Sequence, residues 1–192
     1  MGELNYFKEG WHHIISKSAL DHQLFVLVLA ALYTIKDWRQ VLVLVTAFTI
    51  GHSITLALST LRIVEVQRSV VEFLIPCTIV ITAITNFFQK NFKPEKLHLN
   101  YFLALFFGLI HGLGFANTLR FILAEDENIT WPLLQFNLGL EVGQIVVVTG
   151  ILLLAYIFIY LIRCNRKYWV WLLSAIGFIV ALKLTIERFP ST

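Results

Sequence analysis

Several ionisable side chains stand inside or beside apolar stretches of this sequence. Asp21 and His22 are adjacent at the mouth of one apolar run, and single histidines or glutamates interrupt later runs. An aspartate at the centre of a membrane helix costs about 2.5–3.5 kcal/mol even on lenient scales, so a chain that keeps such groups usually uses them. The predicted metal ligands are His13, Asp21, His22, His52, His111 and Glu141, with His12 and Glu72 as weaker candidates.

Imidazole and carboxylate groups together are typical ligands of first-row divalent metals such as zinc, nickel, cobalt, manganese and iron. No thiolate is placed to join them: the two cysteines, Cys77 and Cys164, stand far apart and form no C-x-x-C pattern. Simpler interpretations remain open for several residues. Asp21 is placed to cap a helix beside a headgroup-facing His22, and Glu72 is placed to extend outward to the membrane surface.

Small residues accompany the two histidines in the middle of the chain. Gly51 precedes His52, and Gly108 with Gly112 forms a G-x-x-x-G face beside His111. Such faces by themselves indicate close helix packing. Further on, three polar residues lie three to four positions apart and so share one helix face, which is expected to face partners on another helix. They are Asn137, Glu141 and Gln144.

The composition indicates a membrane protein. Of 192 residues, 58% are hydrophobic and only 14% are charged, against roughly 25% charged in soluble domains. Basic residues stand at the ends of apolar segments, which indicates anchoring to the lipid bilayer and argues against nucleic-acid binding. The first residues lack an apolar core, so a cleavable signal peptide is not expected.

We predict an all-α polytopic membrane protein: a bundle of about six transmembrane helices forming one domain over residues 1–192, preceded by an amphipathic N-terminal segment. That segment, residues 1–18, is expected to lie at the membrane surface or to form the first turns of the first helix. Residues 74–87 (LIPCTIVITAITNF) are expected to form ordinary membrane helix. The predicted spans are roughly 19–35, 40–61, 69–89, 99–123, 132–162 and 168–187, each near the 20 residues that a crossing requires.

The predicted topology places the candidate ligands at similar depths in the membrane. Connections after the odd-numbered spans hold eight of the 15 Lys and Arg residues, which favours both termini outside the cytoplasm. At about 1.5 Å per residue, His52 and His111 lie roughly 18 Å from one face and Glu141 about 13 Å from the other. Asp21, His22 and Glu72 lie within the first turns from the outer face. An acidic loop, Glu125-Asp126-Glu127, is expected to help collect metal there.

At these residues the chain resembles the HupE/UreJ family of small bacterial membrane proteins. The resemblance rests on HHIISKSALDHQLF, TAFTIGHSITLAL, VVEFLI, FGLIHGLGFA and FNLGLEVGQ, and it covers most of the chain. It implies a nickel or cobalt permease, or an accessory protein that supplies metal to hydrogenase or urease. It also implies that His13, Asp21 and His22 form a metal-recognition element.

The sequence thus favours a transition-metal permease in the bacterial inner membrane, a transporter rather than an enzyme, carrying nickel or cobalt, or zinc. A homo-oligomer and contacts with metalloenzyme maturation proteins are compatible with this prediction. Two alternatives remain open. One is an intramembrane metal-dependent hydrolase that activates water, with Ser53 nearby. The other is a non-catalytic scaffold subunit whose polar groups only join helices.

Overall fold

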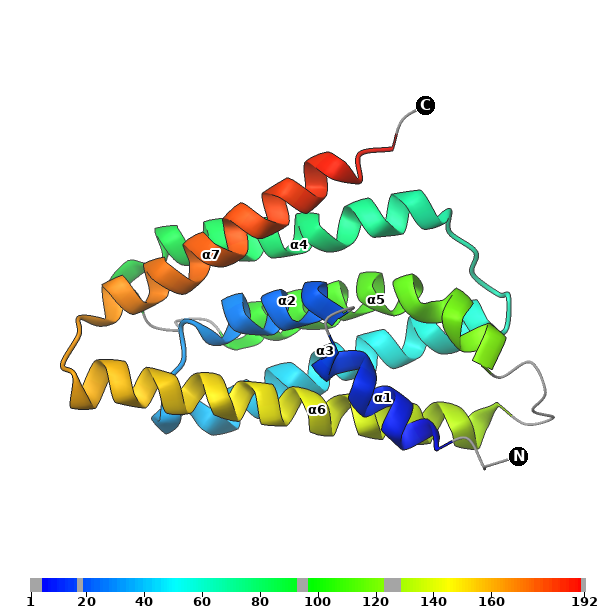
Figure 1. The fold of residues 1–192 in the computed structure, drawn as a ribbon, viewed down its shortest axis with the longest axis horizontal. Coiled ribbons are helices and arrows are strands. Elements are labelled where there is room, and N and C mark those ends of the chain that lie inside the picture. Colours follow the sequence, from blue (N-terminus) through cyan, green and yellow to red (C-terminus); the bar gives the residue numbers. More distant parts are fainter. Residues whose placement is uncertain (1–4, 17–18, 93–96, 123–128, 191–192) are drawn as a thin grey trace.

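A computed structural model describes residues 5–16, 19–92, 97–122 and 129–190, and these residues are helical apart from short connections (Figure 1). Brief 3-10 turns, Ile35–Asp37 and Lys90–Phe92, precede the third and fifth helices, and a π-helical turn at Ile157–Leu161 extends the sixth. The helices are α1 (Tyr6–Ile15), α2 (Leu20–Ala30), α3 (Trp38–Thr60), α4 (Arg68–Phe88), α5 (Leu97–Ile122), α6 (Thr130–Tyr156) and α7 (Arg166–Glu187).

The prediction of six spans is wrong in number. Four segments of the described chain are long and apolar enough to cross a membrane: 35–60, 68–88, 130–161 and 166–187. Two further apolar helices, Leu20–Ala30 and Asn100–Ala116, fall short of that length among the described residues. The 11 residues of α2 cover only about 17 Å at 1.5 Å per residue, roughly half of the hydrocarbon core.

The N-terminal segment is not continuous with the next helix, which was one of its two predicted forms. The segment forms a separate helix, α1, which packs along α6. Figure 1 shows α1 running inward from the end at which both termini lie, whereas α2 begins near the middle of the molecule and runs to the opposite end. The Gln23 side-chain amide fixes the break between them, because it donates to the carbonyl oxygens of Ile14 (2.8 Å) and Ser16 (3.1 Å).

Glycines bring the backbones of α3 and α5 into contact. A Cβ atom added at Gly108 would overlap the carbonyl oxygen of Phe48, and one at Gly112 would overlap that of His52. Small residues allow such crossings in membranes, where van der Waals packing drives helix association. The crossing places His52 on α3 within the same buried layer as His111 on α5, and both side chains are fully buried.

A second glycine crossing holds α1 against α6. A Cβ atom at Gly10 would overlap the carbonyl oxygen of Phe136, and one at Gly139 would overlap that of Phe7. Ile14 packs beside this crossing against Gly143. The short helix α1 is therefore docked by backbone contact, and this fixes the position of His13 near its C-terminus.

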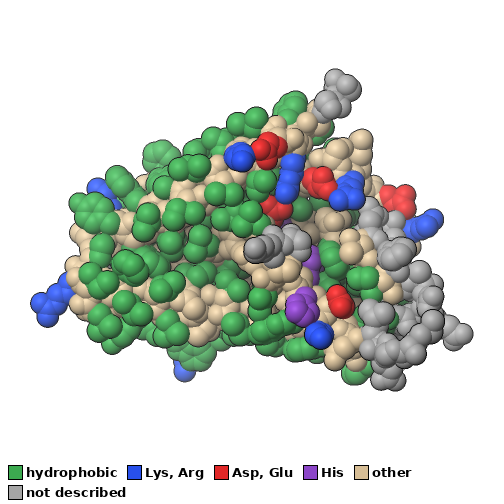
Figure 2. Space-filling view, viewed as in Figure 1, with side chains coloured by type: hydrophobic (Ala, Val, Ile, Leu, Met, Phe, Trp, Pro, Cys, Tyr) green, Lys and Arg blue, Asp and Glu red, His purple; other side chains and the backbone are tan. Residues whose placement is uncertain are grey.

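The outer surface is apolar over most of its length. Figure 2 shows hydrophobic side chains over most of the visible face, with charged groups gathered mainly toward the end where the termini lie. Large side chains such as Phe102, Ile179 and Leu161 are more than 60% exposed. Such a surface is stable against lipid and not against water, so the described helices form a helical membrane protein.

Candidate metal centre

Three histidines from three helices converge in the interior. One ring nitrogen from each of His13 on α1, His22 on α2 and His52 on α3 lies within 4.8 Å of the other two. The ring centroids of His13 and His22 are 4.9 Å apart, and those of His22 and His52 are 5.7 Å apart. The break between α1 and α2 permits this meeting, because a continuous helix would carry His13 and His22 past each other along one axis.

His111 on α5 borders the three. Its ring centroid lies 4.9 Å from that of His22, and its Nε2 lies 3.1 Å from the Thr78 hydroxyl. The Thr78 hydroxyl donates its single proton to the Ile75 carbonyl oxygen (2.7 Å). In its contact with His111, the Thr78 oxygen is therefore the acceptor and His111 Nε2–H is the donor. The lone pair of His111 is then on Nδ1. Such an outer partner fixes the tautomer and orientation of a metal-binding imidazole.

The histidine nitrogens lack partners within the described residues. The unpaired atoms are Nε2 of His13, Nε2 of His22, both ring nitrogens of His52 and Nδ1 of His111, and all are buried. A buried polar atom without a hydrogen bond costs about 1–3 kcal/mol. Burial, assisted by the repulsion of charge on His22 and His52, lowers the pKa of His13 well below its ordinary value. Its ring is therefore neutral at physiological pH, the form that binds metal.

These imidazoles fit a divalent transition metal after a small contraction. Metal–nitrogen bonds are about 2.0–2.1 Å long, so two ligands of one ion lie at most about 4.2 Å apart. The 4.8 Å limit on the nitrogen separations requires side-chain movements of about 1 Å. Nitrogen ligands suit nickel, cobalt, zinc and copper better than magnesium or calcium, which prefer oxygen.

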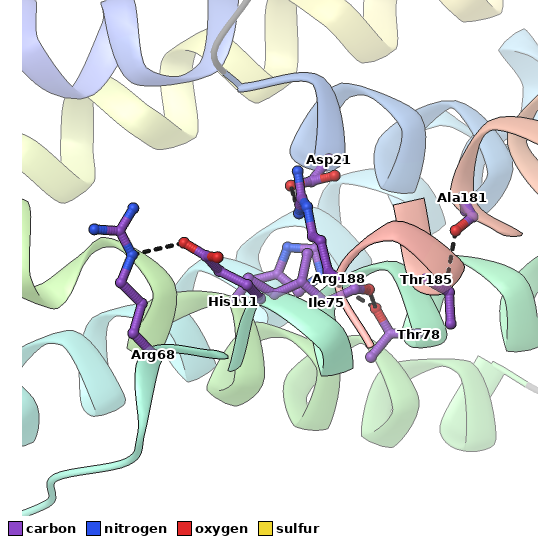
Figure 3. A network of polar contacts seen from close by, with 9 residues as sticks. Asp21, Arg68, Ile75, Thr78, His111, Ala181, Thr185 and Arg188 are labelled. Carbon is purple, nitrogen blue, oxygen red and sulfur yellow. Dashed lines mark hydrogen bonds and ion pairs between the residues drawn. The ribbon is translucent and has the colours of Figure 1, made fainter. Parts of the chain in front are cut away.

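A cleft of about 430 Å³ leads from the surface to the histidines. Figure 2 shows a histidine side chain recessed below the surface, near acidic and basic residues. Two ion pairs line the cleft. Arg188, just after α7, donates to Asp21 Oδ2 (2.9 Å), and Arg68 at the start of α4 pairs with Glu72 (2.6 Å). Figure 3 shows Asp21 and Arg188 facing each other beside His111.

The carboxylates predicted as ligands do not all join the cluster. Asp21 pairs through Oδ2 with Arg188, whereas its Oδ1 is buried and has no partner among the described groups. Glu72 lies in the same cleft and is engaged by Arg68. The structure therefore brings these two acids to the wall of the cleft rather than into the group of converging nitrogens.

Glu141 lies in a different place. It accepts a hydrogen bond from Thr46 (2.7 Å), and one turn along α6 Gln144 accepts one from Thr49 (2.8 Å). These bonds join α6 to α3 beside a separate cavity of about 260 Å³, which Ser53 also lines. The predicted polar stripe thus has partners on another helix: Glu141 and Gln144 meet hydroxyl groups, and Asn137 contacts the His52 imidazole.

The weaker candidate His12 is exposed on the outer side of α1. The acidic loop Glu125-Asp126-Glu127, expected to collect metal, lies outside the described residues.

Sequence reasoning missed three residues that shape this centre. Thr78, which orients His111, lies in the stretch expected to be ordinary membrane helix, where a threonine gives no distinctive signal. Gln23 follows His22 directly and joins α1 to α2. Arg188 stands 167 positions from Asp21, so their pairing was not visible in the sequence. A glutamine directly after His22 was the one available clue.

The fold and the centre together define a helical membrane protein with a buried imidazole cluster. Residues 2–187 match the family described as HupE / UreJ protein. Because the match covers nearly the whole chain, the protein belongs to the HupE/UreJ family, as its motifs predicted. No curated protein and no solved structure matched the chain significantly. The family assignment points to a role in nickel or cobalt transport or supply.

Proposed function

We propose that this protein is a permease for a divalent transition metal, nickel or cobalt in the first place and zinc in the second. One observation carries the proposal: imidazoles from α1, α2, α3 and α5 converge at the base of a cleft with buried nitrogens that have no partner among the described groups. An ion supplied from outside would satisfy these nitrogens. The ion is the cargo, so the ligands need to bind it and also release it.

The surroundings of the cluster support transport rather than permanent retention. The site lies where two short helices meet, and discontinuous helices commonly form the substrate sites of transporters near the bilayer midplane. The Asp21 carboxylate, which lines the cleft, would attract the ion before it reaches His22. The lining of the cleft includes Arg68, Thr118 and Arg188, at the ends of α4, α5 and α7 that lie toward both termini (Figure 1). We propose that this is the extracytoplasmic side of the bacterial inner membrane.

The alternative functions receive less support. Ser53 does not lie at the cluster, because it donates to the Thr49 carbonyl oxygen (2.7 Å) and lines the Glu141 cavity; a hydrolase at this centre would therefore depend on metal-activated water without Ser53. A scaffold in which polar groups only join helices would pair the histidines with other helices. His111 is paired with Thr78 and His52 contacts Asn137, but Nε2 of His13 and Nε2 of His22 have no partner among the described residues. A metal-supply role beside maturation proteins of metalloenzymes remains compatible with the same site.

Uptake of radiolabelled metal tests the proposal. Cells producing the wild type should accumulate nickel or cobalt above cells without it, and His52→Ala and His111→Ala should return uptake to the background. Ser53→Ala serves as the control, because its hydroxyl faces the other cavity. Equal uptake by the wild type and both histidine variants, at equal protein levels, would contradict the permease.

A further inference from the structure

A second cavity lies beyond the histidines, and half of its lining residues are polar. It has a volume of about 210 Å³ between α2, α4 and α5. Its rim is built from residues at helix ends: Gln89 follows α4, and Tyr33 accepts a hydrogen bond from Asn100 near the start of α5 (3.0 Å). These helix ends lie at the end of the molecule opposite both termini (Figure 1). The polar side chains lining it are Tyr33, Thr82, Thr85, Asn86, Gln89 and Asn100.

A layer of three phenylalanines separates this cavity from the histidines. Each lies about one helical turn from a clustered histidine, on the side toward the cavity. Phe25 stacks on Phe48 (4.9 Å between centroids) and meets Phe107 edge-on (5.8 Å), and Phe107 lines the cavity itself. All three are buried. The pairs on each helix are His22 and Phe25 on α2, His52 and Phe48 on α3, and His111 and Phe107 on α5.

This layer is in direct contact with the candidate metal centre. The ring centroid of His111 lies 5.3 Å from that of Phe25 and 5.1 Å from that of Phe48. The aromatic layer is thus a single residue thick. A hydrated ion cannot pass through closely packed rings, since an apolar constriction excludes water and the ions that water carries.

A polar stripe on α4 runs past the aromatic layer. Thr78 contacts His111 on one side of the layer, and Thr82 and Thr85 line the cavity on the other. Each of these hydroxyls donates to a carbonyl oxygen of its own helix, so the hydroxyl lone pairs remain available to an ion or to water. From Thr78 to Thr85 the stripe covers about 10 Å at 1.5 Å per residue.

We propose that this second cavity is the release vestibule of the permeation path, and that Phe25, Phe48 and Phe107 are its gate. This inference rests on the proposed permease function. The vestibule would take a hydrated divalent cation. Its hydroxyl and amide oxygens are neutral and bind transition metals more weakly than imidazole does, so an ion passing the gate leaves a strong site for a weak one.

Cysteine accessibility tests the gate without using metal. Thr82→Cys is introduced into a chain with Cys77→Ser and Cys164→Ser, and a membrane-impermeant maleimide is added to oriented vesicles from either side. The cysteine thiolate attacks the maleimide double bond, and the thiolate forms in water and not in lipid. We expect Thr82→Cys to react only from the side opposite the termini. Ile84→Cys, on the exposed face of the same helix, should react from neither side.

Opening the gate should change that pattern. Adding Phe107→Ala should make Thr82→Cys reactive from the terminal side as well and should raise cobalt leakage into vesicles several-fold. Phe107→Leu, which removes less volume, serves if the alanine variant does not fold. An unreactive Thr82→Cys, reactivity from both sides with the gate intact, or a pattern unchanged by both Phe107 substitutions would overturn the proposal.

Metal uptake by the same cysteine-substituted chain separates the two hypotheses. Uptake together with an unreactive Thr82→Cys would overturn the vestibule and leave the permease standing. One-sided reactivity in a chain that moves no nickel, cobalt or zinc would contradict the permease, and with it the role of the vestibule in ion release.

Discussion

Two groups of polar side chains lie within the apolar helices of this protein, and they differ in how their atoms are satisfied. Around Glu141, carboxylate and amide oxygens accept hydrogen bonds from Thr46 and Thr49 on the neighbouring helix. In the histidine cluster, Nε2 of His22 and both ring nitrogens of His52 form no regular hydrogen bond with the described residues. Nε2 of Gln144, beside Glu141, is also buried and unpaired, but among the described residues the nitrogens that converge within 4.8 Å of one another are those of His13, His22 and His52.

This difference separates a structural contact from a candidate binding site. A satisfied buried group contributes to helix association, at an average of about 0.6 kcal/mol in one well-measured membrane protein. An unsatisfied group costs free energy in the folded protein, and such a cost is expected where the missing partner is a ligand. We therefore expect metal binding to depend on the histidines and to be insensitive to Glu141.

The largest expected effect contrasts those two groups directly. His22→Ala removes the imidazole that lies next to both His13 and His111, so affinity for cobalt should fall by at least about 100-fold. Glu141→Gln keeps a hydrogen-bond acceptor for Thr46 and should leave affinity unchanged. Equilibrium titration of purified protein with cobalt measures both. Comparable losses of cobalt affinity in the two variants would contradict the distinction between the histidine cluster and the Glu141 group.

Displacing α1 should have the next largest effect. Gly10→Ala would force α1 away from the Phe136 carbonyl and carry His13 out of the cluster, with a stability loss of about 1–3 kcal/mol from overpacking. Gly150→Ala is the matched control, because a Cβ there has no neighbour within 4 Å. Thermal unfolding and cobalt titration follow the two effects. Full affinity in a destabilised Gly10→Ala protein would show that His13 is dispensable.

A smaller effect is expected from the residue that orients His111. Thr78→Val keeps the side-chain shape but removes the hydroxyl bonded to His111 Nε2. Cobalt affinity should fall about tenfold, as for other outer partners of metal ligands. Thr149→Val is the control: it removes a hydroxyl that donates only to the Ile145 carbonyl oxygen of its own helix. This variant should leave cobalt affinity intact. Equal affinities for the two variants would mean that His111 needs no such partner.

The smallest effect is expected at the hydrogen bond between Thr46 and Glu141. Thr46→Val removes the hydroxyl that donates to Glu141 and should lower the free energy of unfolding by about 0.6 kcal/mol. Cobalt affinity should not change. Unfolding in mixed detergent micelles measures the first quantity, and titration measures the second. A loss of affinity without a loss of stability would assign the Glu141 group a part in metal binding.

The sequence predicted depth better than direction. Counting residues from helix ends placed His52, His111 and Glu141 at similar depths, because the rise per residue is constant. Depth does not determine which helix a side chain faces. The glycine crossing of α3 with α5 places His52 near His111, whereas Glu141 meets a hydroxyl on another face of α3. Packing partners of this kind depend on the whole bundle.

The break after α1 was also beyond sequence reasoning. Residues 1–18 showed the amphipathic pattern that was predicted, but nothing in that pattern identifies α6 as the helix against which α1 packs. The decisive contacts are the close backbone approaches at Gly10 and Gly139. They join residues more than a hundred positions apart. The helix break in turn allows His13 to meet His22, which a continuous helix would have prevented.

X-ray absorption of cobalt bound to the purified protein tests the central claim most directly, because it reads the ligand atoms themselves. The account predicts one ion with at least the three imidazole nitrogens of His13, His22 and His52 in its first coordination sphere. It also predicts that this sphere loses nitrogen in His52→Ala and stays the same in Glu141→Gln. A coordination sphere of oxygen alone, or one unchanged by His52→Ala, would contradict it.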